Sequence, residues 1–503
     1  MRRWVTPRRG VARVLNKAAA LETAVDLWGI HQRVEMPRLN RIDDALKVAP
    51  PKLERREFIG GPGRHRYGGE FKPTVAIPDD APPIMWELAR KAQTNYLPLL
   101  VRVFRQALHV EGYITSAPPE QNPWRWWQAN RMDGRQVGLH DAALKYGAAY
   151  LSVLPGDEGP AARAFTPRKL AALYQDPEMD EWPMYTVHVD GSSQHLVLTD
   201  EEAEYRFGIE DAAAVSGIAG LPSMSRQLGS SALTFIEARR HDVGVCPVVR
   251  YRDSLLLEGE EQYGIVEPLM VIQERIDETS FGQLVAQYFA AFKQRAVIGW
   301  VPESEAEELK AGASRIWYLD VDKNEVDIKE LTETDLTRYI DSGKSARRDF
   351  ASIGQIPAGD LGVDSISNIS DATLAGLDKA KNARAGEIAL SLGESHEQTQ
   401  RLFARVAGDV EAATDWTSEV RWAEREARTW AGQIDGLVKL VQSEILARDT
   451  AVDMVPGLTD QQVERARADA RKSRAAATVA ALRQPAAASA VVPPDADGDA
   501  VFG

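Results

Sequence analysis

The feature that most constrains the fold is a helical pattern of unusual length. Across residues 268–295, apolar side chains recur at close to helical spacing. At about 1.5 Å per residue, this helix would be a rod of roughly 40 Å, which few globular proteins contain. A second helical pattern at 334–353 would run beside it. The apolar positions that set the first period are Leu269, Ile272, Ile276, Leu284, Tyr288, Phe289 and Phe292.

A short segment with strand character lies between the two helical patterns. Residues 316–319 and 325–328 alternate like the arms of a hairpin around an Asp-Lys-Asn turn. The sequence therefore predicts two antiparallel helices that form a stalk, with a small β module at its far tip. The polar residues of that tip are Asp320, Asp322, Lys323 and Asn324.

A segment of small, hydroxyl-bearing residues follows the second stalk helix, at 357–369. Pro357 blocks continuation of the helix, and two glycines loosen the backbone. Ser370 followed by Asp371 is typical of a new helix start. We interpret the segment as a mobile loop at the opposite end of the stalk from the β module. Its glycine and polar residues are Gly359, Asp360, Gly362, Asp364, Ser365, Ser367 and Asn368.

The remainder of the chain indicates an α+β fold that is mostly helical. Before the stalk, the patterns predict helices at 15–28, at 83–110 and up to Gly147, an irregular connector over 49–84, and strands at 149–154, 183–189, 195–199 and 233–238. Beyond the loop, helical patterns run over 371–406, with room for a break near Gly393, and over 417–446 and 459–482. The Ala-, Pro- and Asp-rich end is expected to be disordered.

Composition narrows the class of protein without choosing a function. The 503 residues are 44% apolar and 27% charged, and no stretch approaches the roughly 20 apolar residues that span a bilayer. The net charge of −14 argues against a protein that grips nucleic acid, although an acidic wall would let a duplex slide past. Cys246 is the single cysteine, so we expect no internal disulfide, a reducing compartment and an intracellular protein.

Two short motifs resemble ligand sites but lack essential residues. The Gly-Lys-Ser at 343–345 ends like a phosphate-binding loop, yet its first glycine would fall on Arg338, and a helix precedes it. We interpret it as a helix surface on which Lys344, Arg347 and Arg348 are positive points. The acidic run 320–331 begins like a calcium loop but has Glu325 and Leu331 where a glycine and a closing acid are needed, which favours a solvated turn.

The sequence also contains no set of residues that matches a known type of catalytic site. His241 and Cys246 could suggest a thiol nucleophile, but a small buried cysteine before a strand is favoured. The eight histidines include no pair at zinc-helix spacing. Trp124, Trp126 and Trp127 with Arg125 could form a stacking platform for bases, or core and subunit contacts. The chain is therefore expected to be no enzyme and to need neither metal nor cofactor.

In the order of its parts, which are a mixed domain, a long helix, a small β module, a second helix, a loop and a third helix, the chain resembles the portal proteins of tailed double-stranded-DNA bacteriophages. It is most similar to the portal proteins of siphophages that infect actinobacteria. The resemblance covers roughly residues 85–445. It is carried by the residues at 126–153, 246–251, 274–300, 312–320, 367–380 and 420–440.

This resemblance implies a ring of about twelve subunits at one capsid vertex, through which DNA enters and leaves. It also implies an N-terminal arm and connector (1–84), a wing (85–264), stem helices (265–295 and 333–356), a clip (296–332), a tunnel loop (357–369), a long wing helix (370–411), a crown (412–480) and a disordered tail (481–503).

The implied partners are the terminase large subunit, the head-tail connector, and the major capsid and scaffold proteins, with no membrane. Assembly is expected in the host cytoplasm and residence in the virion. Lys293, Arg295, Lys344, Arg347 and Arg348 become candidate DNA contacts of the stem.

Two other readings stay open at this point. Another capsid or tail adaptor would have the same helix-rich build without a DNA channel. A hydrolase whose aromatic residues bind a polymer would need acid, base or metal-binding residues that the sequence does not reveal.

Overall fold

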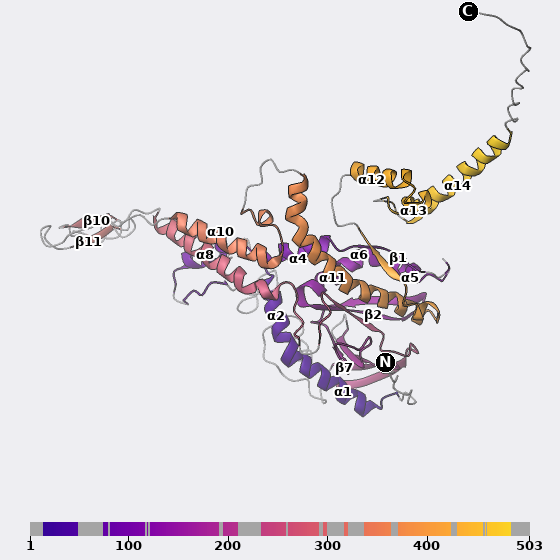
Figure 1. Cartoon of the computed structure of the whole chain (residues 1–503). Helices are drawn as coiled ribbons and strands as arrows, with labels where there is room; N and C mark the ends of the chain where they lie inside the picture. The colour runs from indigo at the N-terminus through magenta and orange to yellow at the C-terminus, as the bar shows by residue number, and fades with distance from the viewer. Residues whose placement is uncertain are drawn as a thin grey trace, which may run out of the picture. The chain divides into compact units, whose positions relative to one another are not determined.

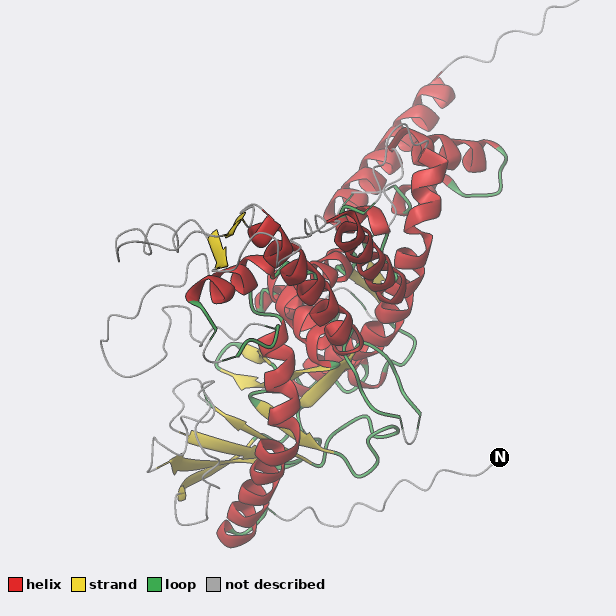
Figure 2. Cartoon of the chain, turned by 90° about the vertical axis from the view of Figure 1, so that its left-hand side faces the viewer, coloured by secondary structure: helices red, strands yellow, loops and turns green. Residues whose placement is uncertain are grey.

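The protein is described from a computed structural model (Figure 1, Figure 2). The described residues are 14–48, 74–78, 81–115, 118, 121–190, 195–209, 233–257, 260–290, 295–298, 316–319, 336–363, 371–423, 430–455, 458 and 460–483. The chain divides into two units, Met1–Arg425 and Glu426–Gly503, which are described separately. The predicted connector at 49–84 lies mostly outside the described residues.

The main core of the first unit is built on a three-stranded antiparallel sheet. Its strand order is β3 (Gly159–Phe165), β2 (Ala148–Gly156) and β9 (Val248–Arg252). Helices α6 (Met132–Tyr146) and α11 (Asp371–Val406) pack against these strands. The predicted helix end at Gly147 is confirmed, because this residue takes the left-handed φ of 83° that ends α6.

A second sheet has its own core. Five antiparallel strands form a meander in chain order: β4 (Leu170–Leu173), β5 (Tyr185–Val189), β6 (His195–Thr199), β7 (Ala203–Ile209) and β8 (Leu233–Arg240). Helix α1 (Lys17–Ile30) covers it through Ala20, Ala24 and Trp28, all fully buried. The strands predicted at 149–154, 183–189, 195–199 and 233–238 are thus confirmed as β2, β5, β6 and β8.

The N-terminal region is built into both cores. The side chain of Asn16 accepts a hydrogen bond of 2.9 Å from Ala19 N, which caps α1. A π-helix, His31–Glu35, joins α1 to α2 (Met36–Ala45) without a loop. Leu39 and Ile42 of α2 then enter the main core. The helix predicted at 15–28 is confirmed, and the helices α1 and α2 pack as part of the first unit.

The single helix predicted over 83–110 is wrong. The structure has two helices there, α3 (Pro83–Ala92) and α4 (Leu97–Gln106), followed by strand β1 (Val110–Ile114). The break between them is stabilised from far along the chain: Gln273 accepts a hydrogen bond from Tyr96 N at 2.9 Å, and Asp277 accepts one from Thr94 N at 3.1 Å. These partners satisfy the backbone donors that a continuous helix would have used.

Two further expectations after the loop are corrected. Helix α11 has no break at Gly393; a Cβ atom there would lie 3.5 Å from Trp422, an ordinary van der Waals distance, so the segment around Trp422 packs against the helix at this point. That segment contains strand β12 (Glu419–Trp422), which pairs antiparallel with β1. The helix predicted over 417–446 is therefore wrong at its start, whereas its later part is confirmed by α12 (Trp430–Gln442). Pairing with a strand some 300 residues earlier leaves no local signal in the sequence.

The second unit consists of helices α12 (Trp430–Gln442), α13 (Arg448–Asp453) and α14 (Asp460–Arg483). The helix predicted at 459–482 is confirmed as α14. The second unit begins after Arg425, and the crown expected over 412–480 stays a prediction. The expected tail beyond Arg483 lies outside the described residues.

Candidate functional site: the helical stalk and its root

The predicted stalk is confirmed as an antiparallel pair of helices, α8 (Met270–Ala290) and α10 (Leu336–Gly354) (Figure 1). Arg275 of α8 forms an ion pair of 2.6 Å with Asp349 of α10. Further out, a Cβ atom on Gly282 would lie 3.2 Å from Tyr339, and one on Gly343 would lie 3.8 Å from Thr279. Residue numbers therefore rise along one helix as they fall along the other. We refer to α8 and α10 together as the stalk.

Burial changes along the stalk. Near its base, Ile276, Ala346 and Phe350 are at most 3% exposed and belong to the main core. Beyond Thr279 of α8 and before Ala346 of α10, no residue whose side chain the structure describes is fully buried. Apolar residues there, among them Leu284, Val285 and Tyr339, remain half-buried. One chain alone therefore leaves the outer stalk only partly covered.

The strand pair beyond the stalk differs from the predicted hairpin. Strand β11 (Ile316–Leu319) is present as expected, but its described partner is β10 (Arg295–Ile298), and the two run parallel. Parallel pairing requires a crossover connection rather than a tight turn. The second predicted arm, at 325–328, lies outside the described residues, as do Asp320, Asp322, Lys323 and Asn324 at the expected tip.

The candidate basic residues occupy different settings. On α10, Lys344 is half-buried and lies 3.9 Å from Asp341, whereas Arg348 is exposed. Arg347 is half-buried, and its Nε atom is buried without a hydrogen-bond partner. The Gly-Lys-Ser motif therefore does lie on a helix. The backbone of Arg295 pairs with that of Ile316 in the strand pair, and Lys293 falls outside the described residues.

The segment interpreted as a loop begins with an ordered turn. After α10, Ala358–Leu361 forms the 3-10 helix η5, and Gly362 ends it with a left-handed φ of 67°. Leu361 is 3% exposed and joins the main core, while Asp360, beside Lys381 and Asp378, is exposed. Gly359 and Asp360 therefore lie in an ordered turn, and the loop expected over 357–369 stays a prediction. Asp364, Ser365, Ser367 and Asn368 lie outside the described residues.

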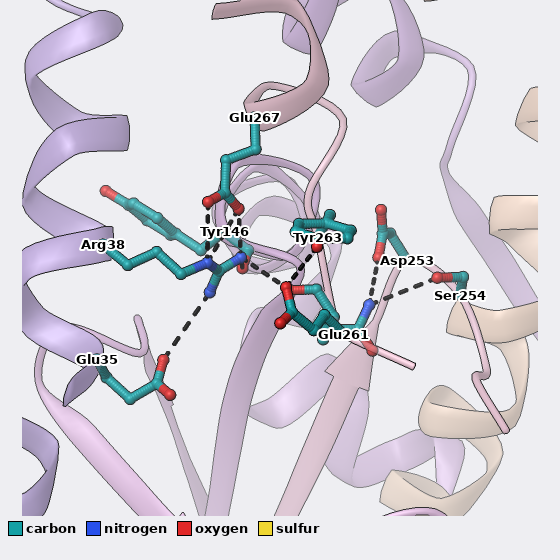
Figure 3. A network of polar contacts seen from close by, with 9 residues as sticks. Glu35, Arg38, Tyr146, Asp253, Ser254, Glu261, Tyr263 and Glu267 are labelled. Carbon is teal, nitrogen blue, oxygen red and sulfur yellow. Dashed lines mark hydrogen bonds and ion pairs between the residues drawn. The ribbon is translucent and has the colours of Figure 1, made fainter. Parts of the chain in front are cut away.

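The base of the stalk is tied to the N-terminal helices by one arginine (Figure 3). Arg38 of α2 donates from Nε and Nη2 to the carboxylate of Glu267, with a shortest distance of 2.6 Å. Nη2 also donates to the carbonyl oxygens of Tyr146 and Gln262, at 3.2 and 2.8 Å. Glu267 begins the 3-10 helix η4 (Glu267–Leu269), which leads directly into α8. We call residues 262–269 the stalk root.

The stalk root passes very close to the end of α6. Ile265 N donates to Leu144 O at 2.9 Å. A Cβ atom on Gly264 would lie 2.5 Å from Lys145 O, and one on Gly147 would lie 2.8 Å from the carbonyl carbon of Tyr263. Both positions therefore require glycine. Beside them, burial raises the pKa of Asp253 to about 7, although Arg384 opposes the shift, and its carboxylate accepts a hydrogen bond from Gln262.

A buried polar network between α6, β9 and α11 was not predicted. His140 of α6 and His396 of α11 lie 2.7 Å apart through their Nε2 atoms. His396 Nδ1 contacts the Tyr251 hydroxyl at 3.1 Å, and that hydroxyl contacts Thr399 at 2.5 Å. These groups come from residues up to 256 positions apart, so no local pattern could have brought them together.

The aromatic and cysteine candidates have structural settings. Trp127, in helix α5 (Trp124–Ala129), is fully buried and stacks on Trp124 with ring centroids 5.0 Å apart. Cys246 is 1% exposed, and burial raises the pKa of its thiol. Its sulfur lies 3.5 Å from Thr199 O, whereas His241 contacts Asp200 O. The prediction of a small buried cysteine is confirmed.

The described part of the chain contains neither a membrane-spanning helix nor a cluster of metal ligands. None of its helices combines the length and apolar character needed to cross a bilayer. No group of three or more His, Cys, Asp or Glu residues in those ranges is arranged to hold a metal ion.

The chain that forms this body, the antiparallel stalk and the 36-residue helix α11 belongs to the class of phage portal proteins, as its match to a family model shows. The chain belongs to the family described as "Phage portal protein, SPP1 Gp6-like", whose model matches residues 84–476. This family consists of structural proteins of bacteriophage virions. The recognition made from the sequence is thereby confirmed.

The solved structures that resemble this chain include two of low sequence identity. One structure, "Neck of empty GTA particle computed with C6 symmetry", has 11% identity and a TM-score of 0.38, covering 73% of this chain and 89% of its own. Another, "Virion of native gene transfer agent (GTA) particle", has 13% identity and a TM-score of 0.37, covering 75% and 94%. No curated protein matches the sequence. The family assignment rests on the family model.

Proposed function

We propose that copies of this chain close into a ring of about twelve subunits that surrounds DNA at one vertex of the capsid. The observation that carries this proposal is the incomplete burial of the outer stalk. Half-buried apolar residues such as Leu284 and Tyr339 would gain full burial only against neighbouring stalks. A closed cyclic arrangement covers both sides of every stalk and leaves no subunit with a bare face.

Within this ring, each part of the chain would have one task. Residues 85–264 and 370–411 would form the wing, the stalk would line the passage as the stem, and residues 412–480 would contribute the crown. Residues 296–332 would dock the terminase large subunit during packaging and the head-tail connector afterwards. Scaffold and major capsid proteins would meet the wing during assembly.

The tunnel loop would consist of an anchor and a free part. The packed turn η5, held by Leu361, supports the anchor, with Gly359, Asp360 and Gly362 within or directly beside it. Asp364, Ser365, Ser367 and Asn368 follow in the sequence and would reach the DNA. Neutral and acidic polar groups can touch phosphates without holding them, which suits a duplex that must keep moving.

Ring formation can be tested by mass and microscopy. The purified chain is expected to give a native mass of about twelve times 55.5 kDa, with a central hole wide enough for a duplex. Leu284→Glu would place a charge in the subunit contact, and we expect the ring to require at least about tenfold higher concentration to form. Ile236→Glu, at a residue 49% exposed on β8, is the matched control and should assemble normally. A monomer at every concentration, or a ring without a hole, contradicts the proposal.

The basic residues of the stalk can be tested in packaging. Arg347→Gln/Arg348→Gln removes two positive charges per subunit from α10, and we expect packaged and retained DNA to fall by about threefold or more, because phosphate contacts are lost. The control is Arg206→Gln/Arg240→Gln, which removes two exposed arginines from the second sheet. Intact rings that retain DNA equally well in both variants would remove Arg347 and Arg348 from the channel.

A further inference from the structure

A cleft that the proposed function does not use opens in the first unit. Its volume is about 670 Å³. Its walls are the residues after β4, the end of β9, the middle of α11 and the segment around β12. All four parts are described and belong to the same unit.

The cleft is acidic. Six carboxylates and three guanidinium groups line it, which leaves a net charge of three negative units. Two of the three arginines are engaged by the walls: Arg401 donates to Glu181 at 3.2 Å and stacks over Trp416 at 4.4 Å, and Arg250 lies 4.0 Å above the ring of Tyr174. The carboxylates are Glu178, Asp180, Glu181, Glu394, Glu397 and Glu419.

Three of the carboxylates lie together on α11 and β12, and the positive charge of Arg401 acts on Glu397. Glu394 and Glu397 of α11 and Glu419 of β12 make no ion pair with any residue that the structure describes. Glu397 accepts one hydrogen bond, from Val420 N at 3.3 Å. Burial, supported by the negative charges of Glu394 and Glu419, raises the pKa of Glu397 to about 6. This corner would therefore be stabilised by an added positive charge.

The rim of the cleft is apolar. Four large apolar side chains there face solvent, with exposed fractions between 55% and 77%. Carboxylates interleaved with exposed apolar groups suit a peptide that combines arginine with an aromatic or aliphatic side chain. The four are Met179, Leu255, Leu390 and Trp416.

The chain itself contains such a peptide at its start. Residues 1–13, with the sequence MRRWVTPRRGVAR, carry five arginines and one tryptophan and no acidic residue. Thirteen extended residues reach about 43 Å. The described chain begins beside β7, where Leu15 N donates to the Tyr205 hydroxyl at 2.8 Å. Strand β4 is three strands away, about 14 Å, and Tyr174, directly after β4, lines the cleft.

We propose that residues 1–13 lie in this cleft of the same chain, with arginine side chains on Glu394, Glu397 and Glu419 and Trp4 against the apolar rim. The basic start of the chain would then be a clasp across the first unit, from the second sheet to the junction of α11 and β12. This proposal is independent of ring formation.

Peptide binding tests the match between cleft and occupant. A labelled peptide of residues 1–13 is titrated into the chain that lacks residues 2–13, and we expect saturable binding that weakens steeply with salt. Glu394→Gln/Glu419→Gln in the protein, or glutamine at all five arginines of the peptide, should weaken binding by about tenfold. The control Glu201→Gln/Glu274→Gln changes two exposed carboxylates outside the cleft. No binding, or equal binding to both double variants, overturns the proposal.

Disulfide trapping in the otherwise full-length chain tests which copy supplies the peptide. Val5→Cys combined with Leu390→Cys should form an intrachain disulfide under mild oxidation, seen as a mobility shift of the single chain. Cys246 does not compete, because it is 1% exposed. The control pair is Val5→Cys with Val34→Cys, which is 63% exposed and lies outside the cleft. Equal trapping at position 34, or cross-linked dimers when the two single variants are mixed, contradicts the proposal.

Discussion

Replacing Gly264 with alanine is expected to lower the free energy of unfolding of the first unit by about 3 kcal/mol or more. The new methyl group would lie 2.5 Å from Lys145 O and 2.6 Å from Leu144 O. Both are backbone atoms of the last turn of α6, so no side chain can rotate to relieve the contact. The stalk root would have to move away, which breaks the hydrogen bond from Ile265 N to Leu144 O. Urea denaturation followed by circular dichroism measures the loss.

A glycine in the same region provides the control. Gly134 lies within α6, and a Cβ atom there would meet nothing within 4 Å. Gly134→Ala should therefore raise the free energy of unfolding slightly, by up to about 1 kcal/mol, because alanine favours a helix. Gly264→Ala should also reduce ring formation, since the root sets the direction of the stalk. Equal stability of the two variants would show that the close approach at Gly264 has no energetic consequence.

The stalk was predictable because its helices carry their own signals. A regular period of apolar residues specifies α8 and α10, and Pro357 limits how far α10 can run. The joint between α3 and α4 shows the opposite case. Its backbone donors are satisfied by Gln273 and Asp277, which come some 180 residues later. A sequence window that contains only residues 83–110 therefore indicates one helix.

The candidate site was predictable in its parts and not in its geometry. The sequence indicated that Arg347 and Arg348 lie on a helix. The exposure of each side chain, however, depends on which side of α10 faces α8. Residues 357–363 look pliable in the sequence because they contain two glycines. In the structure, Leu361 packs into the core and converts them into an anchored turn. A single apolar residue among glycines gives little local signal, yet its burial determines the conformation.

The order of modules was more informative than composition. The net charge of −14 is compatible with a protein that repels DNA and with one that lets it slide, so it favoured no function. The succession of mixed body, long helix, strand segment, second helix and loop indicated the portal family. The family model matches residues 84–476, nearly the same span as the resemblance. Residues 14–48 precede this span, and their packing on both cores became visible only in the structure.

One backbone carbonyl, Leu108 O, determines which atoms donate and which accept in the buried histidine pair. Leu108 O, 3.2 Å from His140 Nδ1, can only accept, so the proton of His140 is on Nδ1. His140 Nε2 then accepts from His396 Nε2, and His396 Nδ1 accepts from the Tyr251 hydroxyl. Every member is neutral in this arrangement. A proton added to His140 Nε2 would face the N–H group of His396 Nε2, so two donors would meet at a site where both rings are fully buried.

Replacing His396 with leucine is expected to lower the free energy of unfolding at pH 7 by about 3 kcal/mol, because His140 Nε2 loses its buried partner and the Tyr251 hydroxyl loses one of two. Burial lowers the pKa of His140 to about 4 and that of His396 well below 6.5. The unfolded chain therefore binds more protons than the folded chain below pH 6.5, and stability falls as the pH drops from 6.5 towards 4. The double variant His140→Leu/His396→Leu should flatten part of this decline, because burial also lowers the pKa of His31 and that of His188 to about 4. Unfolding measured between pH 4 and 7 with the same slope in all variants would exclude the pair as an acid-sensitive joint between α6 and α11.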